Sequence, residues 1–599
     1  MCGIVGYIGN KKVDIELIES LKKLEYRGYD SSGLSMIVDG NIKTLKAEGK
    51  IANLEEIITG ESNAKLGIAH TRWATHGSPT TTNAHPHNSS DKKWSIVHNG
   101  IIENFQDLKQ NLINDKSVNF VSETDTEVIV QQLQHLYNGN ILQTVIETCK
   151  QLIGSFALAI LNVENPNSLY LAKRKSPLYV AKTETEIFVA SDPICFVGKA
   201  KNYYSMDDNE FCEASIENLE FYNHNGEVIE KQAIDLTIQE ENYGKNNYSH
   251  FMLKEIMEVP QVLNRITKTY NDNCVFSKLD KNKLNEINKV ILVGCGTAYH
   301  ACLMGASYIE KFAKIDCRAL IASEFRYSDP IIDNKTLAIF VSQSGETADT
   351  IMAQNLAKEK SATTVGVTNV LYSTLAKSVD FVLPVCAGPE IAVASTKAYT
   401  AQITVLYMFA KYLDNVRNNK CYDFISDVIK LSEYNITENE KQIEYIANEL
   451  VKNDKTVFFI GRNWDYITAT EASLKLKEIT YINSQSYPAG ELKHGYLALV
   501  EKDSIVFVIA TKKDLFDKTL NASFEASARG AKIVLISQFD IPQDKRDSFF
   551  DIIKLSDMDE NLMSISSIAT FQILAYLTSI KKNINPDQPR NLAKSVTVE

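Results

Sequence analysis

The chain of 599 residues contains little cysteine, and its ten cysteines are spread thinly. No two of them stand at the CxxC spacing that many zinc sites and redox motifs use. A disulfide framework and a cysteine-based zinc site are therefore not expected. A reducing compartment, the cytoplasm, fits this use of cysteine.

Positive charge is also in short supply. The 63 Lys and Arg residues are outnumbered by 75 Asp and Glu residues, which gives a formal net charge of −12. Binding to a phosphate backbone usually needs a basic face, so nucleic acid is not expected as a partner. A phosphorylated small molecule is still allowed, because it needs only a local pocket.

Long hydrophobic runs are almost absent. The opening stretch MCGIVGYIG has no preceding Lys or Arg and is too short for the apolar core of a secretory signal. Residues 562–580 carry no charge, but several Ser and Thr residues and a Gln interrupt them. A membrane-spanning helix would be more uniformly apolar, so we expect a buried helix there and no membrane partner.

The second residue of the chain is a cysteine. Cys2 could be a small buried residue at the start of an N-terminal strand. If Met1 is removed, Cys2 instead becomes the terminus and carries both a thiol nucleophile and an α-amine that can serve as its base.

The pattern of predicted strands and helices changes along the chain. Residues 2–238 alternate many short β-rich runs with a few helical stretches, which predicts an α+β layered domain. Residues 239–250 are polar and predict a linker. The remainder alternates strands with longer helices, which predicts parallel sheets, and three landmarks recur at offsets of 167 to 169 residues. We therefore expect two copies of one α/β domain, at 251–430 and 431–590.

Two turns in the first copy have the composition of an anion site. Gly294 and Gly296 end one strand, but Tyr299 stands where a dinucleotide fingerprint needs its third glycine, which disfavours a nicotinamide site. After the next strand, SQSGET crowds four polar side chains around Gly345, and no Walker lysine motif is present. These residues fit a phosphate held by neutral donors, although helix capping is the simpler explanation for each of them alone. The four are Ser342, Gln343, Ser344 and Thr347.

A helical stretch in the second copy, EASLKLKEI, places Glu471 and Glu478 on one otherwise apolar face, with Lys475 between them. A solvated, salt-bridged helix would explain these charges. The alternative is a general base for proton transfer. His494 follows in GELKHGY, on a predicted loop, where it could shuttle protons if a carboxylate lies nearby.

Five of the ten histidines fall between His70 and His98, but their spacing does not favour a metal site. The same region supplies Arg72, whose planar guanidinium group can bind a carboxylate through two hydrogen bonds. It also supplies Asn99-Gly100, a possible oxyanion hole. Asp125 could receive an α-ammonium group. A nucleophile, an oxyanion hole, a carboxylate clamp and an ammonium acceptor together fit the hydrolysis of glutamine.

At this point the sequence resembles a known family, the glutamine–fructose-6-phosphate aminotransferases (isomerizing), also called glucosamine-6-phosphate synthases. The resemblance spans the whole chain, and the order and spacing of its motifs make it specific. The motifs are CGIVGYIG, LEYRGYDSSGL, HTRWATHG, HNGIIEN, VGCGTAYHA, SQSGETADT, VASTKAYT, LKLKEI, GELKHG and QPRNLAKSVTVE.

The resemblance implies an N-terminal nucleophile (Ntn) glutaminase sandwich followed by two sugar isomerase (SIS) domains and a catalytic tail, 591–599. It implies that Cys2 attacks glutamine and that Asn99 and Gly100 stabilise the oxyanion. Trp73 would gate internal ammonia transfer. The residues implied to hold glutamine are Arg72, Thr75, His76 and Asp125.

For the sugar half, the resemblance implies that Glu478 moves a proton between C1 and C2, with Lys475 beside it. Lys594 would form a Schiff base with the open-chain ketose. His494 would open the sugar ring and would come from the neighbouring subunit, which implies a homodimer. The implied sugar-phosphate contacts are Thr297, Ser342, Gln343, Ser344, Thr347, Val393 and Ser395.

The resemblance thus predicts an aminotransferase that makes glucosamine 6-phosphate and glutamate from fructose 6-phosphate and glutamine. This is the first step of hexosamine synthesis, and no metal or organic cofactor is expected. A glutamine-dependent amidotransferase for another sugar phosphate is the alternative. The chain departs from the family pattern at Ala298, where many members carry Ser, and at Tyr496, where Pro is usual.

Overall fold

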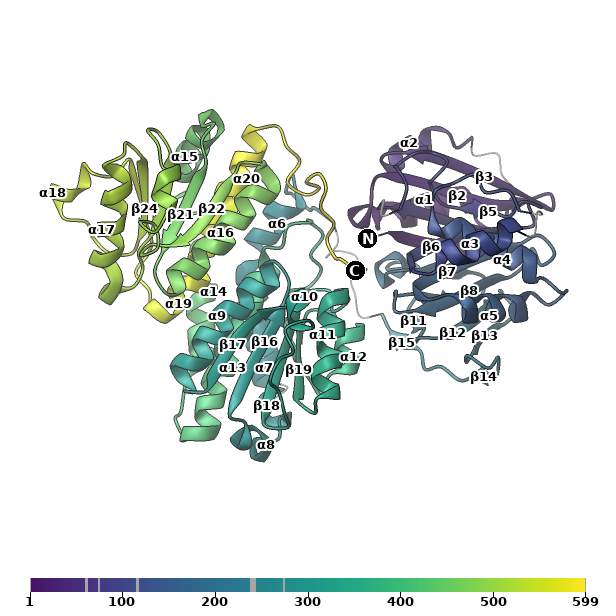
Figure 1. The fold of residues 1–599 in the computed structure, drawn as a ribbon, viewed down its shortest axis with the longest axis horizontal. Coiled ribbons are helices and arrows are strands. Elements are labelled where there is room, and N and C mark those ends of the chain that lie inside the picture. Colours follow the sequence, from purple (N-terminus) through teal and green to yellow (C-terminus); the bar gives the residue numbers. More distant parts are fainter. Residues whose placement is uncertain are drawn as a thin grey trace. The chain divides into compact units, whose positions relative to one another are not determined.

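A computed structural model describes residues 2–59, 63–73, 76–114, 118–236, 244–272 and 275–597. The chain divides into two compact units (Figure 1). The first comprises Met1–Gly244 together with Ala593–Glu599, and the second comprises Lys245–Leu592. Residues 239–243 of the predicted linker, 239–250, lie outside the described residues.

Two antiparallel sheets form the first unit. Their strand orders are β15-β11-β9-β10-β1-β4-β2-β3 and β14-β13-β12-β8-β7-β6-β5. The larger sheet contains β1 (Gly3–Ile8), β2 (Ser31–Val38), β3 (Asn41–Glu48), β4 (Leu66–Arg72), β9 (Tyr179–Lys182), β10 (Ile187–Ala190), β11 (Asn202–Ser205) and β15 (Ile234–Asp235). The smaller sheet contains β5 (His87–Asn88), β6 (Trp94–Ile102), β7 (Gly154–Asn162), β8 (Leu169–Arg174), β12 (Glu210–Ala214), β13 (Leu219–Tyr222) and β14 (Val228–Ile229).

Helices cover the outer faces of both sheets, so the unit is a four-layer sandwich (Figure 1). Because strand side chains alternate, β6 sends Val97 into the core between the sheets and Ile96 into the core beneath the helices. The predicted α+β Ntn sandwich is confirmed. The larger sheet packs against α1 (Val13–Lys22) and α2 (Ile51–Glu56), the smaller against α3 (Phe105–Asn114), α4 (Asp125–Leu136) and α5 (Ile141–Gln151).

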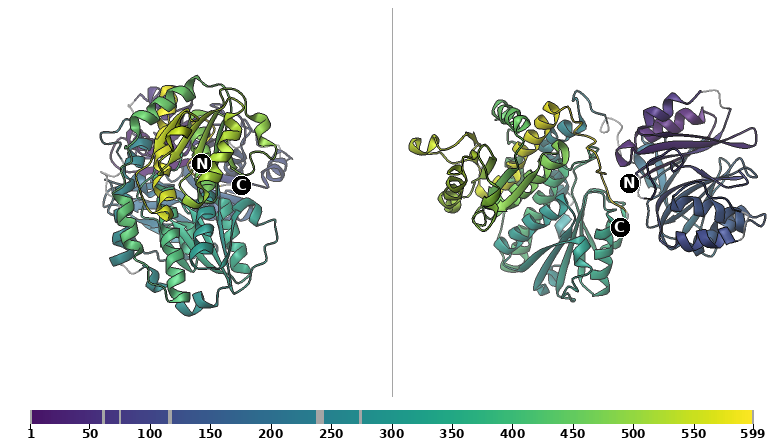
Figure 2. Two further views of the ribbon diagram at one scale, coloured as in Figure 1. Left: turned by 90° about the vertical axis from the view of Figure 1, so that its left-hand side faces the viewer. Right: turned by 45° about the horizontal axis from the view of Figure 1, so that its top comes forward.

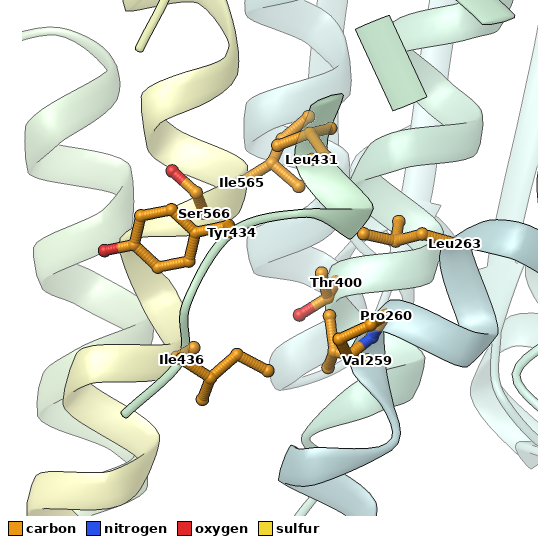
Figure 3. A pocket seen from close by; sticks show the side chains of 10 residues that line it. Val259, Pro260, Leu263, Thr400, Leu431, Tyr434, Ile436, Ile565 and Ser566 are labelled. Atoms are coloured by element: carbon orange, nitrogen blue, oxygen red, sulfur yellow. The ribbon is translucent and has the colours of Figure 1, made fainter. Parts of the chain in front are cut away.

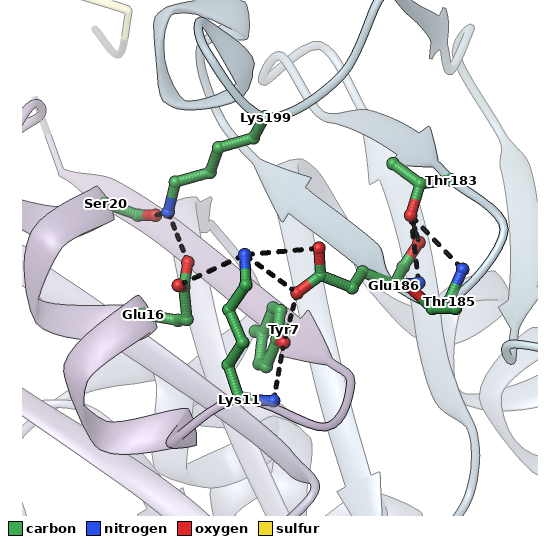
Figure 4. A network of polar contacts seen from close by, with 8 residues as sticks. All are labelled: Tyr7, Lys11, Glu16, Ser20, Thr183, Thr185, Glu186 and Lys199. Carbon is green, nitrogen blue, oxygen red and sulfur yellow. Dashed lines mark hydrogen bonds and ion pairs between the residues drawn. The ribbon is translucent and has the colours of Figure 1, made fainter.

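A network of charged side chains holds the far end of β1 in place (Figure 4). The Tyr7 hydroxyl donates to Glu186 at 2.6 Å, and Lys11 pairs with the same carboxylate at 3.2 Å. On α1, Glu16 accepts from Lys199 at 2.7 Å. These contacts fix β1 against its neighbours at one end, while Cys2 immediately precedes its other end.

The second unit contains two five-stranded parallel sheets with the same order, β17-β16-β18-β19-β20 and β22-β21-β23-β24-β25. The predicted duplication is therefore confirmed. The first sheet contains β16 (Lys289–Gly294), β17 (Asp316–Ile321), β18 (Thr336–Ser342), β19 (Thr363–Thr368) and β20 (Phe381–Pro384). The second contains β21 (Val457–Gly461), β22 (Ser484–Pro488), β23 (Ile505–Ile509), β24 (Lys532–Ser537) and β25 (Asp551–Lys554).

Helices lie on both faces of each sheet (Figure 2). One continuous apolar core joins the two copies, and Val290 and Leu292 of the first sheet and Phe459 and Phe507 of the second belong to it. The helices are α6 (Phe251–Met257), α7 (Val259–Asp272), α8 (Lys281–Glu286), α9 (Thr297–Phe312), α10 (Ala322–Phe325), α11 (Ala348–Glu359), α12 (Thr374–Ser378), α13 (Lys397–Asn418), α14 (Phe424–Ser432), α15 (Glu440–Lys452), α16 (Trp464–Thr480), α17 (Phe516–Ser527), α18 (Gln543–Arg546), α19 (Glu560–Ser566) and α20 (Ile568–Lys581).

The uncharged segment 562–580 falls on α19 and α20. In the described part of the chain, Glu560–Lys581 is the one stretch long and apolar enough to span a bilayer, and 89% of its most apolar window is buried in the protein. Its side chains contribute to the core that the two copies share, including Phe571 and Leu574. The prediction of a buried helix is therefore confirmed.

Candidate active site

Cys2 and Asn99 come from different sheets of the first unit and meet directly. Cys2 immediately precedes β1, and Asn99 lies within β6. The Asn99 side-chain amide donates to the Cys2 carbonyl oxygen at 3.1 Å. The Trp73 backbone N–H lies 3.3 Å from Cys2 Sγ. The predicted nucleophile and one predicted oxyanion donor therefore lie together.

Several groups act on the Cys2 thiol. Burial raises its pKa, and the N-terminal charge, the Trp73 N–H and the Arg72 guanidinium oppose that effect only in part. The net pKa of Cys2 stays above its ordinary value. A thiol of this kind needs a nearby base to become a nucleophile at neutral pH.

Gly100 has a backbone conformation that only glycine adopts without strain. Its φ is +139°, and a Cβ atom there would lie 2.0 Å from the Ser155 carbonyl oxygen. Any other residue would push β6 away from β7 at this point. The position next to Asn99 is therefore fixed by the space available.

Arg72, at the end of β4, is buried, and neighbouring carbonyl groups orient its guanidinium. Its Nη atoms donate to the carbonyl oxygens of His76, Gly77 and Ser78, the last two at 3.3 Å. His76 thus touches Arg72 through its backbone, and its ring packs edge-on against Phe105. Thr75, also predicted to hold glutamine, lies outside the described residues.

Asp125 is the first residue of α4, and hydrogen bonds around the start of that helix set its position. The Thr124 hydroxyl accepts from the Glu127 N–H at 3.3 Å, and the Glu127 carboxylate accepts from the Ser122 N–H at 2.6 Å. The Asp125 carboxylate accepts from the Ile102 N–H of β6 at 2.8 Å. This bond ties the predicted ammonium acceptor to the strand that carries Asn99.

In the second unit, the two predicted anion turns follow neighbouring parallel strands, β16 and β18. Ligands of open α/β sheets bind at the carboxyl edge where the strand order reverses, which is between these strands. Thr347 precedes α11, but its hydroxyl makes no capping bond and lies 3.0 Å from Ser342 Oγ instead. Simple helix capping therefore does not explain the Thr347 hydroxyl.

Gly345 lets the turn after β18 close tightly. Its φ is +66°, and a Cβ atom there would lie 2.0 Å from Ser373 Oγ. The Gly345 N–H donates to Ser342 Oγ at 3.0 Å, and the Glu346 N–H donates to Ser344 Oγ at 3.2 Å. The predicted hydroxyl groups thus gather in one turn, with half-buried Gln343 between them.

The charged face of α16 meets the start of α9. Lys475 Nζ lies 3.0 Å from Thr297 Oγ1, 2.6 Å from a Glu478 oxygen and 3.4 Å from a Glu471 oxygen. Glu471 also contacts His300 Nδ1 at 2.7 Å. Glu471 and Lys475 are fully buried, so the reading of a solvated salt-bridged helix is wrong for this pair.

Burial alone would lower the pKa of Lys475, but the carboxylates of Glu478 and Glu471 outweigh it and hold that pKa above its ordinary value. Lys475 therefore remains a cation at neutral pH. Its charge compensates two carboxylates that would be costly to bury alone.

The loop before α13 is held by the carboxylate of Glu390 within it and by a backbone carbonyl group of the C-terminal segment. Ser395 donates to Glu390 at 3.1 Å, and Glu390 also accepts from the N–H groups of Thr396 and Ala398. The Val393 N–H donates to the Asp587 carbonyl oxygen at 3.0 Å. The two predicted sugar contacts in this loop are thus fixed from both sides.

The two remaining predicted catalytic residues are His494 and Lys594. His494 is exposed in a turn after β22, before the short 3-10 helix Tyr496–Leu499, so the predicted loop follows a strand rather than a helix. In the described ranges, no hydrogen bond or ion pair connects its side chain to the α9–α16 cluster. Lys594 lies in the segment that groups with the first unit.

Sequence reasoning missed two residues that complete the polar network, His300 and Glu390. His300 stands one helical turn after Thr297 on α9, a spacing that signals a shared face. Its partner Glu471 lies 171 residues away, and no local pattern connects the two.

The two copies hold different side chains at the positions of Thr297 and Lys475. At the 167-residue offset, Trp464 replaces Thr297, and its ring packs against Tyr308, which corresponds to Lys475. Asp465, buried at the start of α16, accepts from the Thr511 N–H at 2.8 Å and from its hydroxyl at 2.5 Å. The hydrogen-bonded Asp465 carboxylate and the Trp464–Tyr308 ring pair therefore stand at the corresponding place, the start of α16.

An apolar pocket lies elsewhere in this unit, between α7, α13, α14 and α19 (Figure 3). Its lining includes Val259, Leu263, Thr400 and Tyr434. None of the predicted sugar contacts lines it, so it is separate from the α9–α16 cluster.

Comparison with known proteins agrees with this arrangement. The protein-family model for the glutamine amidotransferase domain matches residues 70–197. The protein-family model for the SIS domain matches residues 283–412 and 450–581. A glutamine–fructose-6-phosphate aminotransferase (isomerizing) of Caldanaerobacter subterraneus is 42% identical, and one of Aquifex aeolicus is 40% identical. Both alignments cover all of this chain and all of the relative.

A solved structure is similar to the second half of the chain. The C-terminal domain of glucosamine-fructose-6-phosphate aminotransferase from Francisella tularensis is 31% identical, with a TM-score of 0.52. The match covers 58% of this chain and 100% of the solved chain.

Proposed function

Because the chain belongs to the family of glutamine–fructose-6-phosphate aminotransferases (isomerizing), we propose that it makes glucosamine 6-phosphate and glutamate from fructose 6-phosphate and glutamine. The observation that carries this proposal is that one chain holds both the Cys2–Asn99 contact and the cluster around Lys475. The first suits amide hydrolysis, and the second suits proton transfer on a sugar phosphate.

In the glutamine half, Met1 is removed and the α-amine of Cys2 takes the thiol proton. The thiolate attacks the amide carbon, and the oxyanion forms opposite Asn99 and the Gly100 N–H. The amine returns a proton to the leaving ammonia, and water then releases glutamate from the thioester. Arg72 and Thr75 bind the substrate with His76, while Asp125 accepts its α-ammonium group.

In the sugar half, hydroxyl and amide groups hold the phosphate at the carboxyl edge of β16 and β18. Glu478 removes a proton from C1 of the C2 imine and returns it at C2, which yields the amino aldose. Lys475 orients Glu478 through their 2.6 Å ion pair. The sugar contacts are Thr297, Ser342, Gln343, Ser344, Thr347, Val393 and Ser395.

Two further groups complete the reaction. Lys594 forms a Schiff base with the ketose at C2, and ammonia displaces it there. His494 of the partner subunit opens the sugar ring. This role is supported by the exposure of His494 and by the lack, within the described chain, of a hydrogen bond or ion pair between its side chain and the α9–α16 cluster. The proposed enzyme is a cytoplasmic homodimer in which ammonia travels internally past Trp73.

The test is a parallel measurement of both products. Purified protein is incubated with glutamine, with and without fructose 6-phosphate, and glutamate and glucosamine 6-phosphate are quantified together. Equal amounts of both, with sugar-stimulated glutamate release, are expected. Glutamate without the amino sugar would refute the proposal and would favour another acceptor. The shared name of the full-length relatives does not favour that alternative.

A further inference from the structure

Four histidines of the first unit are buried in contact with one another. The rings of His70 and His85 stack with their centroids 4.2 Å apart. The centroid of the His85 ring also lies 5.0 Å from that of His87 and 6.4 Å from that of His98. In the described part of the chain, no group of three or more His, Cys, Asp or Glu side chains is arranged to hold a metal ion. These histidines therefore need another explanation.

Burial disfavours the charged form of all four rings. Burial lowers the pKa of His70 to about 3 and holds the pKa of His85, His87 and His98 below the ordinary value. A neutral imidazole carries one proton, so one ring nitrogen donates a hydrogen bond and the other accepts. The neighbours of each ring therefore decide which nitrogen carries the proton.

The neighbours of His70 allow only one arrangement. Its Nε2 lies 3.0 Å from the His98 carbonyl oxygen and 3.0 Å from Asn99 Oδ1. The carbonyl oxygen can only accept, so Nε2 carries the proton and donates to both oxygens. Among the described residues, the opposite nitrogen, Nδ1, is buried without a hydrogen-bond partner, as suits a nitrogen that carries no hydrogen.

This donor in turn fixes the Asn99 amide. With Oδ1 accepting from His70, the amide nitrogen must face the other way, where it donates to the Cys2 carbonyl oxygen at 3.1 Å. A flipped amide would set N–H against N–H at His70 and oxygen against oxygen at Cys2. Both mismatches are buried, and each would leave a polar group unpaired.

We propose that His70 is a positioning residue for amide hydrolysis, which holds the Asn99 side chain with its N–H groups toward the oxyanion. This inference rests on the role proposed above for Asn99. It predicts that His70 matters when negative charge develops on the substrate oxygen and matters little for binding of the substrate itself.

Two substitutions separate this role from simple packing. In His70→Gln, the side-chain amide nitrogen can reach the position of Nε2, whereas in His70→Asn it is too short. His87→Gln is the matched control, since His87 belongs to the same buried group and contacts Thr124 at 3.1 Å rather than Asn99. Thermal denaturation of each variant checks that the first unit is folded.

The probes are glutamate and its γ-semialdehyde. The aldehyde adds the Cys2 thiol and forms a hemithioacetal whose oxygen lies where the oxyanion forms, whereas glutamate reports substrate binding alone. Removing an oxyanion donor typically costs about 10²- to 10³-fold in rate. We expect His70→Asn to lower kcat for glutamine and semialdehyde affinity at least 10-fold, with less than a threefold change in KM and in glutamate affinity.

His70→Gln should recover most of that loss, and His87→Gln should keep the wild-type ratio of semialdehyde to glutamate affinity. In an Asn99→Ala background, His70→Asn should cost nothing further, because its effect passes through Asn99. Equal losses for both probes, or an undiminished loss in that background, would overturn the inference. If the wild-type protein bound the semialdehyde no tighter than glutamate, the proposed role of Asn99 would fail as well.

Discussion

Lys475 Nζ and Thr297 Oγ1 are joined by a 3.0 Å hydrogen bond, although the two residues lie 178 positions apart and in different SIS copies. The same ammonium group pairs with Glu478 at 2.6 Å. The proposed sugar site therefore draws on both copies, because one supplies the predicted anion turns and the other supplies the cation and the proposed base.

Replacing Lys475 tests this dependence. Lys475→Met leaves Glu471 buried without its cation, which should cost about 3–5 kcal/mol of stability. We expect at least a 100-fold loss of glucosamine 6-phosphate formation, with glutaminase activity in the absence of sugar changed less than twofold. Lys477→Met is the control, since Lys477 is exposed on the same helix. Similar losses in both variants would contradict the account.

Gly345 offers a test of the anion turn. In Gly345→Ala, the new Cβ would lie 2.0 Å from Ser373 Oγ at a φ of +66°, so the turn must open. We expect the KM for fructose 6-phosphate to rise at least 10-fold while sugar-independent glutaminase activity stays the same. Gly40→Ala carries similar strain at φ +74° with nothing within 4 Å, and should leave that KM unchanged.

The identity of the base for Cys2 can be tested by lengthening the chain. An alanine inserted between Met1 and Cys2 would remove the free α-amine from Cys2 without changing its side chain. Because burial holds the Cys2 pKa above its ordinary value, loss of this base should reduce glutamine-dependent synthesis to about 1% or less.

Synthesis from added ammonium salts should continue in that variant. Mass spectrometry of the unmodified protein should show that Met1 is absent. Full glutamine-dependent activity with the extra residue in place would mean that another group deprotonates the thiol.

Asp465 gives the protein a distinctive pH dependence. Burial raises its pKa to about 6, whereas an unfolded Asp titrates near 3.9. Between these values the folded state retains a proton that the unfolded state has lost, so stability from this group falls as pH rises from about 4 to 6. The full cost, about 3 kcal/mol, is present above pH 6.

In Asp465→Asn this dependence is removed. The thermal midpoint of the variant relative to wild type should therefore rise between pH 4 and pH 7, as calorimetry would measure. Asp514→Asn, at an exposed position in the same region, should show no such trend. A constant difference between wild type and Asp465→Asn across this range would show that the carboxylate is not buried as described.

The duplication could be predicted because its landmarks are local. Glycine turns and apolar strands at Gly294 and Gly461 stand at a fixed offset, and each is encoded within a few residues. The two copies already differ in sequence at this turn, because ATKKDL in the second copy has one hydroxyl residue where SQSGET in the first has three. The buried position of Asp465 in the second copy could not be predicted, because its hydrogen bonds to Thr511 connect separate segments of the chain.

The site was harder to predict where its parts come from distant segments. Glu471 and Glu478 stood out as carboxylates on an apolar face, but the partner His300 lies on another helix. The histidines between His70 and His98 were visible as a cluster of one residue type. Their effect on Asn99 depends on which ring nitrogen faces which oxygen, and no sequence pattern encodes that choice.

The central claim is that the two halves act as one enzyme and pass ammonia internally. The most direct test uses glutamine labelled with ¹⁵N in its amide, in the presence of fructose 6-phosphate and an excess of unlabelled ammonium salt. We predict that the glucosamine 6-phosphate formed carries mainly ¹⁵N, since ammonia released at Cys2 would not mix with the solution. Product labelled only in proportion to the ¹⁵N present in the solution would contradict the account.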